Sequence, residues 1–189
     1  VADVNGDGLM DLFFANYGPN GLFLNRGGGQ FTDASAAWGI AVDGRYDACA
    51  FADIDHDGRL DLYVNGTVTG GTSYPDSLFV NTGAKFDDVT PPLIRDLEAD
   101  HGVQWADFDA DGDLDLSLTG SQTTGMHLIL RNQLPQRDAQ RSVHVRALNA
   151  QGRATRAGAE VRVFESGSNR LLGARLVDSG SGYNAQSDI

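Results

Sequence analysis

Three short stretches of the 189-residue sequence place acidic side chains at alternate positions. They read DVNGDGLMD from Asp3, DIDHDGRLD from Asp53 and DFDADGDLD from Asp107. In every copy, positions 1, 3, 5 and 9 carry a side-chain oxygen and position 6 is glycine. Alternating oxygens on a tightly wound loop converge on one point, and the glycine permits the sharp bend. This pattern favours the binding of a hard divalent cation.

The candidate ligands are those four positions and the main-chain carbonyl of position 7, whose side chain varies between the copies. They are Asp3, Asn5, Asp7, Leu9 and Asp11; Asp53, Asp55, Asp57, Arg59 and Asp61; and Asp107, Asp109, Asp111, Asp113 and Asp115. Calcium accepts six to eight oxygens in flexible geometry, so we predict up to three Ca²⁺ ions, one per loop. Position 12 is apolar in each copy, which excludes an EF-hand.

The alternative interpretation is an Asx-rich turn without metal. Three or four carboxylates within about 5 Å repel one another, however, and without a cation some of them would have to take up protons. Three such loops in the same register favour the cation.

The loops belong to a repeating unit, because they begin at residues 3, 53 and 107 and short apolar runs follow each of them. Each unit supplies about four short antiparallel strands, the size of a propeller blade. A sandwich also has closely spaced strands, but it would not ordinarily repeat the same aspartate loop. We therefore predict an all-β fold with a partial β-propeller of three four-stranded blades over residues 1–133. Three blades cannot close a ring, so we expect a fragment of a larger protein.

Charge divides the chain into two parts. Residues 1–131 hold 21 acidic and 6 basic residues, whereas residues 132–189 hold 5 acidic residues and 8 arginines. We predict a linker over residues 134–140 and a small β-rich domain over residues 141–189. The acidic first part argues against nucleic acid, since phosphate binding needs clustered Lys and Arg. No apolar run approaches the length of a membrane span.

Catalytic residues are not evident, and we predict no enzyme. The four histidines are scattered, and none has a nearby Ser, Cys or Glu arranged as a nucleophile and base. His101 aligns with Asp47 of the previous repeat. The single cysteine, Cys49, excludes an intrachain disulfide and is expected inside a strand.

The unit D-x-[DN]-x-D-G-x-x-D-L, set between short strands over roughly residues 1–132, resembles the FG-GAP/VCBS repeat. That resemblance implies a calcium-carrying β-propeller, as in integrin α-subunits and many secreted bacterial proteins, with the ligand positions named above. Asn5 keeps an oxygen but lowers the charge, so a weaker first site is expected.

The remainder resembles the ASPIC/UnbV domain of the cartilage acidic protein-like family. The resemblance is carried by the strand-like SVHVRAL (142–148), by RAGAEVRVF (156–164) and by VDSGSGYNAQSD (177–188). The combined architecture implies an exported protein, extracellular or on the cell surface, with a bacterial periplasm or outer surface also open. We expect a non-catalytic calcium-binding module for adhesion or for binding a protein or glycan. The alternative is an accessory region of a larger secreted hydrolase or lyase whose catalytic residues lie elsewhere.

Overall fold

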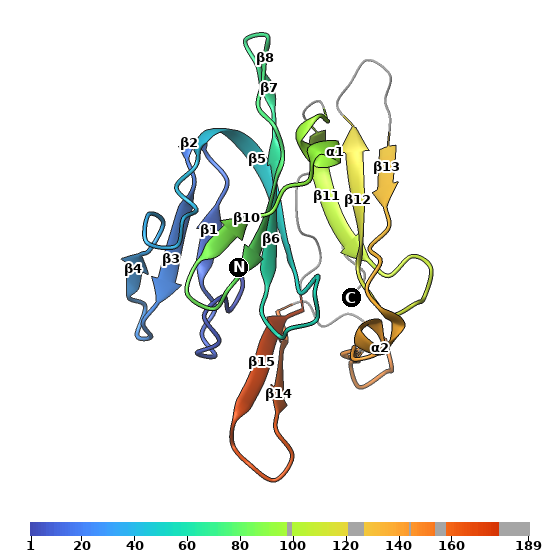
Figure 1. The fold of residues 1–189 in the computed structure, drawn as a ribbon. Helices are drawn as coiled ribbons and strands as arrows, with labels where there is room; N and C mark the ends of the chain where they lie inside the picture. Colours follow the sequence, from blue (N-terminus) through green and yellow to red (C-terminus); the bar gives the residue numbers. More distant parts are fainter. Residues whose placement is uncertain (98–99, 121–126, 144, 154–157, 178–189) are drawn as a thin grey trace.

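The computed structural model describes residues 1–97, 100–120, 127–143, 145–153 and 158–177 of the chain. Within these residues the fold is all-β, and its three larger antiparallel sheets stand side by side (Figure 1).

The first sheet is formed by the first repeat. Its strand order is β1-β3-β4, with bounds Leu12–Phe14, Gly21–Asn25 and Phe31–Asp33. Ala2 pairs with Asp11 through a single antiparallel bridge. The same pairing closes the second and third loops, where Ala52 lies opposite Asp61 and Ala106 opposite Asp115.

The second sheet has the order β10-β9-β6-β5-β2. Its strands are β2 (Tyr17–Pro19), β5 (Asp43–Ala52), β6 (Asp61–Gly66), β9 (Ser77–Asn81) and β10 (Phe86–Asp88). Since β2 comes from the first repeat and pairs with β5, it joins the two repeats. A small hairpin, β7 (Val68–Thr69) and β8 (Thr72–Ser73), extends the connection from β6 to β9.

The third sheet has the order β11-β12-β13, with bounds Asp100–Ala106, Asp115–Gly120 and His127–Leu130. The helical turn α1 (Pro92–Arg95) precedes it and buries Ile94.

Two apolar clusters hold the sheets together, one on each side of β6. Leu62 and Val64 pack with Leu22 and Ile40 of the first repeat. Tyr63 faces the other way and packs with the cluster that contains Val103 and Leu118 of the third repeat. Successive side chains of a strand point to opposite faces, so β6 is buried along its whole length because a sheet covers each face.

The predicted all-β partial propeller is confirmed. The second repeat supplies four strands of its own, β5, β6, β9 and β10, as predicted. Among the described residues, the first and third repeats supply three strands each to their own sheets. Within the described chain, the first repeat has no full strand equivalent to β5, and only the Ala2–Asp11 bridge occupies that position. The third repeat has no sequence equivalent of β4 and β10, the last strands of the first two repeats.

Residues 134–177 contain the helical turn α2 (Gln136–Ala139) and the hairpin of β14 (Glu160–Phe164) and β15 (Leu171–Leu176). α2 lies inside the predicted linker 134–140, and the domain boundary stays a prediction. The described part of the strand-like segment 142–148 forms no strand, and Val143 is 81% exposed, so no neighbouring strand covers it. His144 and residues 178–188 lie outside the described residues.

Neither α1 nor α2, the helices of the described residues, has the length and apolar character that a membrane-crossing helix needs.

Candidate metal centres

The backbone bends in the same way in all three acidic loops. Position 4 has a positive φ in each copy: +72° at Gly6, +57° at His56 and +60° at Ala110. The glycine at position 6 also has a positive φ in each copy, at Gly8, Gly58 and Gly112. Left-handed backbone is unfavourable for Ala and His, so the surrounding hydrogen bonds must hold the loop in this shape.

The first aspartate of each loop is a main-chain acceptor. Asp53 accepts hydrogen bonds from the N–H groups of Asp57 and Gly58, both at 3.0 Å. The equivalent bonds to Asp3 and Asp107 measure 2.9 to 3.1 Å. Both oxygens of position 1 therefore help to wind the loop.

The last aspartate of each loop ties its two ends to the sheet. Asp61, which is 1% exposed, accepts from the N–H of Ile54 at 3.0 Å and from the N–H of Asn81 at 2.8 Å. Asp11 and Asp115 accept equivalent pairs of bonds at 2.8 to 3.1 Å. Position 9 is consequently fixed by the fold itself.

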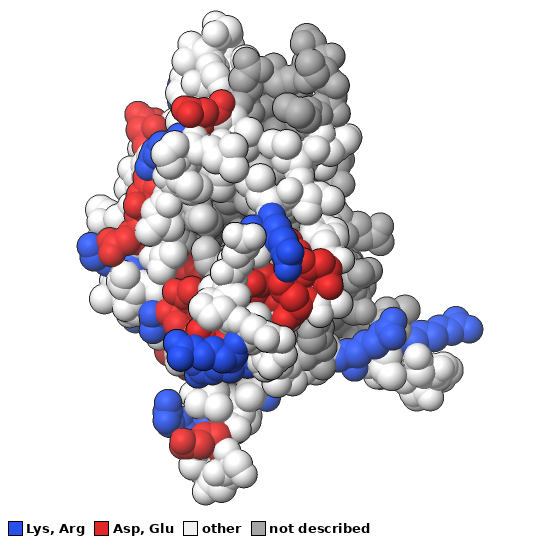
Figure 2. All heavy atoms as spheres, turned by 45° about the vertical axis from the view of Figure 1, so that its right-hand side comes forward, with Lys and Arg blue, Asp and Glu red and all other residues white. Residues whose placement is uncertain are grey.

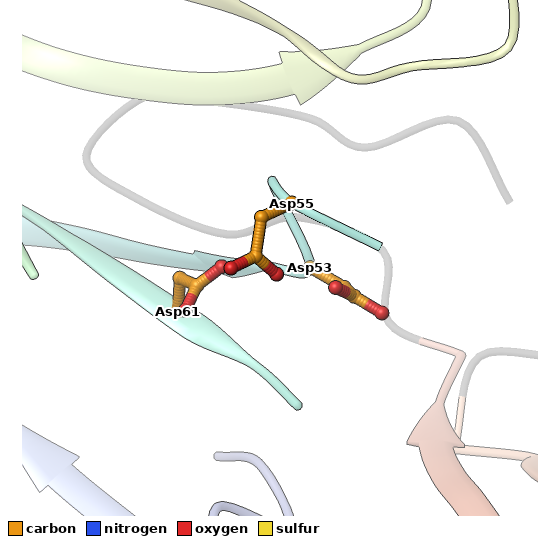
Figure 3. A group of neighbouring side chains, drawn as sticks. All are labelled: Asp53, Asp55 and Asp61. Carbon is orange, nitrogen blue, oxygen red and sulfur yellow. The ribbon is translucent and has the colours of Figure 1, made fainter. Parts of the chain in front are cut away.

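In two of the loops, the carboxylates of positions 1, 3 and 9 come together. The ligand atoms of Asp53, Asp55 and Asp61 lie within 4.8 Å of one another, and so do those of Asp107, Asp109 and Asp115. Figure 3 shows the first group gathered where the loop leaves β5 and enters β6. In the first loop, position 3 is Asn5 instead of an aspartate. Its side-chain amide donates a hydrogen bond to the carboxylate of Asp7 at 2.9 Å.

Burial and neighbouring carboxylates make the charged form of several loop aspartates unfavourable, and this electrostatic strain raises their pKa values. The pKa of Asp61 is raised to about 7, mainly by burial and also by the charges of Asp55 and Asp57, against the opposing effect of its two backbone hydrogen bonds. Burial is also the main cause of the raised pKa values of Asp53 and Asp11. A bound cation would relieve this strain, and a donor set made only of oxygens fits Ca²⁺. The residues present therefore fit the predicted ion.

Position 5 is neutralised in another way. Arg59 pairs with Asp57, while Arg131, which follows β13, contacts Asp111 of position 5 at 2.8 Å and also Asp109 of position 3 at 2.6 Å. The hydrogen bond from Arg131 is the main cause of the lowered pKa of Asp111. Figure 2 shows basic side chains lying directly against acidic clusters on this face. The structure thus brings positions 1, 3 and 9 together and turns position 5 towards arginine in loops two and three.

The side chains at position 7 have partners outside the ligand group. Arg59 donates to the carbonyl of Asn81 at 2.7 Å as well as to Asp57. Asp113 is fully buried and accepts from the N–H of Leu134 at 2.9 Å. Ligation by the main-chain carbonyls of Leu9, Arg59 and Asp113 stays a prediction.

Strand-end asparagines connect each loop to its surroundings, and the sequence interpretation assigned them no role. Asn81 donates to the carbonyl of Val4 in the first loop at 2.8 Å, and Asn132 donates to the carbonyl of Ile54 in the second loop at 2.8 Å. Asn25 donates to its own loop, at the carbonyl of Met10. The available signal was the asparagine that ends GLFLN, SLFVN and HLILRN.

The C-terminal part of the described chain lies against the loops. Arg162 of β14 donates to the carbonyl of Gly8 at 3.1 Å, and burial lowers the pKa of Arg175 of β15 despite the opposing charges of Asp53 and Asp3. α2 also takes part, since the ring of His56 contacts the carbonyl of Asp138 at 2.8 Å. A small pocket between the first two loops and β15 is lined by residues that include Asp3, Gly58 and Arg175.

Another histidine joins the second and third repeats. Nδ1 of His101 lies 2.8 Å from the carboxylate of Asp47. Each of these aligned residues lies at a register shift in its strand, β11 or β5. Bulges re-aim side chains, which explains how equivalent positions of neighbouring sheets meet.

The chain is similar to a known repeat family and to known proteins. Residues 3–64 match the FG-GAP-like repeat family, a segment that includes the first two loops. This segment is an FG-GAP-like repeat region. The chain is also 31% identical over 122 residues to cartilage acidic protein 1 of Homo sapiens, a match that covers 61% of the chain and 18% of that protein.

The same protein of Mus musculus is 30% identical over 122 residues, and that of Xenopus tropicalis is 33% identical over 124 residues. Each match covers 61% of the chain, which thus spans 18% of the length of these curated relatives. The predicted resemblance to FG-GAP repeats and to the cartilage acidic protein-like family is confirmed, and the assignment of residues 141–189 to an ASPIC/UnbV domain stays a prediction.

Proposed function

We propose that the chain is a non-catalytic, calcium-binding propeller module that acts outside the cell or at its surface and binds a partner protein. The observation that carries this proposal is the pair of acidic groups, Asp53, Asp55 and Asp61 with Asp107, Asp109 and Asp115, whose ligand atoms lie within 4.8 Å of one another. Like charges so close together need a counter-ion, and oxygen ligands on flexible loops suit calcium.

Calcium would have a structural role in this proposal. The groups that would hold it are the loop carboxylates that follow directly after β5 and β11, and Asp61 and Asp115 also begin β6 and β12. An ion bound there would hold the entry and exit of each loop together, and extracellular calcium modules work at dissociation constants of about 10⁻⁴–10⁻³ M. Calcium would thus make the sheets rigid under extracellular conditions.

Calcium calorimetry on the chain and on Asp55→Asn tests this proposal. Asp55 is exposed and lies in the second acidic group, so its replacement, which gives position 3 the same amide as in the first loop, should weaken calcium binding at that loop about fivefold and leave the third loop unchanged. The matched control is Asp96→Asn, an exposed aspartate at the end of α1, which removes the same charge outside the loops. Unchanged calcium affinity in Asp55→Asn, or equal losses in both variants, would contradict the assignment.

A further inference from the structure

An arginine lies between two tyrosines near the start of β5. The guanidinium carbon of Arg45 is 5.9 Å from the ring centre of Tyr17 and 5.7 Å from that of Tyr74. Both distances lie within the range of a cation–π contact. Tyr17 is 62% exposed, so the stack reaches the surface.

The backbone around this stack is held by three segments. Tyr17 of β2 lies directly opposite Arg45 of β5 in the sheet. On the other side, the carbonyl of Arg45 accepts from Thr67, whose own carbonyl accepts from the N–H of Tyr74. Because both rings and the arginine are anchored in this way, the guanidinium is ordered before any ligand arrives, which lowers the entropy cost of binding.

Arg45 forms no ion pair within the described part of the chain. Of the six basic residues in the first 131, four form ion pairs: Arg59, Lys85, Arg95 and Arg131. Among the described residues Arg45 contacts no carboxylate, and its one hydrogen bond is to the carbonyl of Gly44 at 2.7 Å. An arginine held by aromatic rings keeps most of its donors for a planar acceptor.

We propose that the Tyr17–Arg45–Tyr74 stack is a docking site for a partner protein and receives a single glutamate or aspartate carboxylate from it. Apolar surface lies beside the charge, since Tyr17 is exposed and Val68, which follows Thr67, is 49% exposed. Tyrosine and arginine are the residue types that dominate protein–protein binding energies. The partner segment therefore has one acidic residue between apolar neighbours.

A polyanionic glycan fits this surface less well. Residues 1–131 carry 21 acidic against 6 basic residues, and exposed Asp43 lies two positions before Arg45. A chain of repeated negative charges would be repelled by this surface, whereas a single carboxylate pairs with Arg45 alone.

The stack is remote from the acidic loops. Asp53 lies eight positions after Arg45 along the extended strand, a separation of about 26 Å. Figure 1 shows β2 and the β7–β8 hairpin at the end of the molecule opposite β14 and β15. The inference rests on the proposed binding role, but it does not depend on calcium ligation.

The test is an NMR titration of the full chain, monitored at the Arg45 Nε–H resonance. The probe is acetyl-Leu-Glu-Leu-amide, with acetyl-Leu-Gln-Leu-amide and a hyaluronan tetrasaccharide as comparisons. We expect a saturable shift with the glutamate peptide and binding about tenfold weaker for the glutamine peptide, as the loss of a charge-assisted hydrogen bond implies. Titrations in calcium and in EDTA, with calcium binding measured separately, distinguish failure of this inference from failure of the calcium proposal.

Variants separate recognition from folding. Arg45→Gln should weaken the binding of the glutamate peptide about tenfold, measured at the Thr67 amide, and Arg45→Lys should restore it in part because a lysine keeps the charge without the planar fork. The matched control is Arg26→Gln, an exposed arginine of the first repeat that donates to Thr32.

The melting temperatures of the three variants show whether a loss of binding reflects a loss of folding. Equal binding of both peptides, no saturable shift, or tighter binding of the tetrasaccharide would overturn the proposal. If Arg45→Gln is unfolded, the glutamate and glutamine peptides on the unmodified chain still decide it.

Discussion

The second and third acidic loops share their fold but not their charge balance. In both, positions 1, 3 and 9 come together within 4.8 Å, and position 9 accepts two main-chain N–H groups. In the third loop Arg131 contacts both Asp109 and Asp111, whereas Asp55 of the second loop contacts no basic side chain in the described part of the chain. The two loops thus have the same geometry, but among the described residues a basic side chain contacts the position 3 carboxylate only in the third loop.

The difference separates two roles of the acidic residues. Position 1 accepts N–H groups of its own loop, and position 9 accepts one N–H of the loop and one from the end of a following strand, so both hold the loop in shape whether or not an ion is bound. Position 3 is the exposed carboxylate that an ion and an arginine can share. We therefore expect position 9 to control folding and position 3, with its neighbours, to control calcium affinity.

The largest expected effect is at position 9. Asp61→Ala and Asp115→Ala should each lower the free energy of unfolding by about 3 kcal/mol, because each leaves two main-chain N–H groups without their acceptor. Chemical denaturation in EDTA measures this loss without any contribution from calcium.

Exposed Asp96→Ala is the control for this prediction, and it should change the free energy of unfolding by less than about 0.5 kcal/mol. The two loops should respond alike, since their bonds at position 9 are equivalent. A loss of unfolding free energy in only one of the two variants would show that position 9 does not have the same role in both loops.

Removal of calcium should have a smaller effect. At about 2 mM calcium, dissociation constants of about 10⁻⁴–10⁻³ M correspond to about 0.6–1.8 kcal/mol of stabilisation per loop. The melting temperature of the chain should therefore fall by several degrees in EDTA and recover when calcium is added back. Equal melting temperatures in calcium and in EDTA would count against ion binding in both loops.

The first loop can be made to resemble the other two. Asn5→Asp supplies the missing carboxylate at position 3, and we expect the calcium affinity of this loop to rise about fivefold, as one additional charge at close range implies. Calorimetry measures the change. Exposed Gln30→Glu is the control, since it makes the same amide-to-acid change outside the loop, and an equal gain there would show only a general charge effect.

The smallest effect is expected from the arginine of the third loop. Arg131→Gln removes a competing cation, so the calcium affinity of the third loop should rise roughly threefold while that of the second loop stays unchanged. Arg137→Gln is the control, because Arg137 is 86% exposed and pairs only with the adjacent Asp138 among the described residues. A fall in affinity would mean that Arg131 positions the ligands instead of competing for them.

The sequence predicted those features that depend on local pattern. The tripled D-x-[DN]-x-D-G motif predicted the bend at each loop, and the apolar runs after it predicted β6, β9, β12 and β13. Local pattern cannot show which neighbours meet in space, so the contact of Arg131 with Asp109 was not predicted. The same limit applies to Arg162, which reaches the first loop from 154 residues away.

The structure also assigns a second role to residues that the sequence treated as equivalent ligands. Asp57 and Asp61 were both predicted to bind calcium, yet Asp57 lies against Arg59 and Asp61 is fixed by two backbone groups. The side-chain oxygen alone does not distinguish these roles, because they depend on burial and on the strand that follows.

A crystal structure determined in calcium, with anomalous difference density, would show directly whether the second and third loops bind the ion. We expect one ion in the second loop and one in the third, each about 2.3–2.6 Å from the oxygens of Asp53 and Asp55 or of Asp107 and Asp109. Loops that keep the same shape in millimolar calcium, with water alone among these carboxylates, would contradict this expectation.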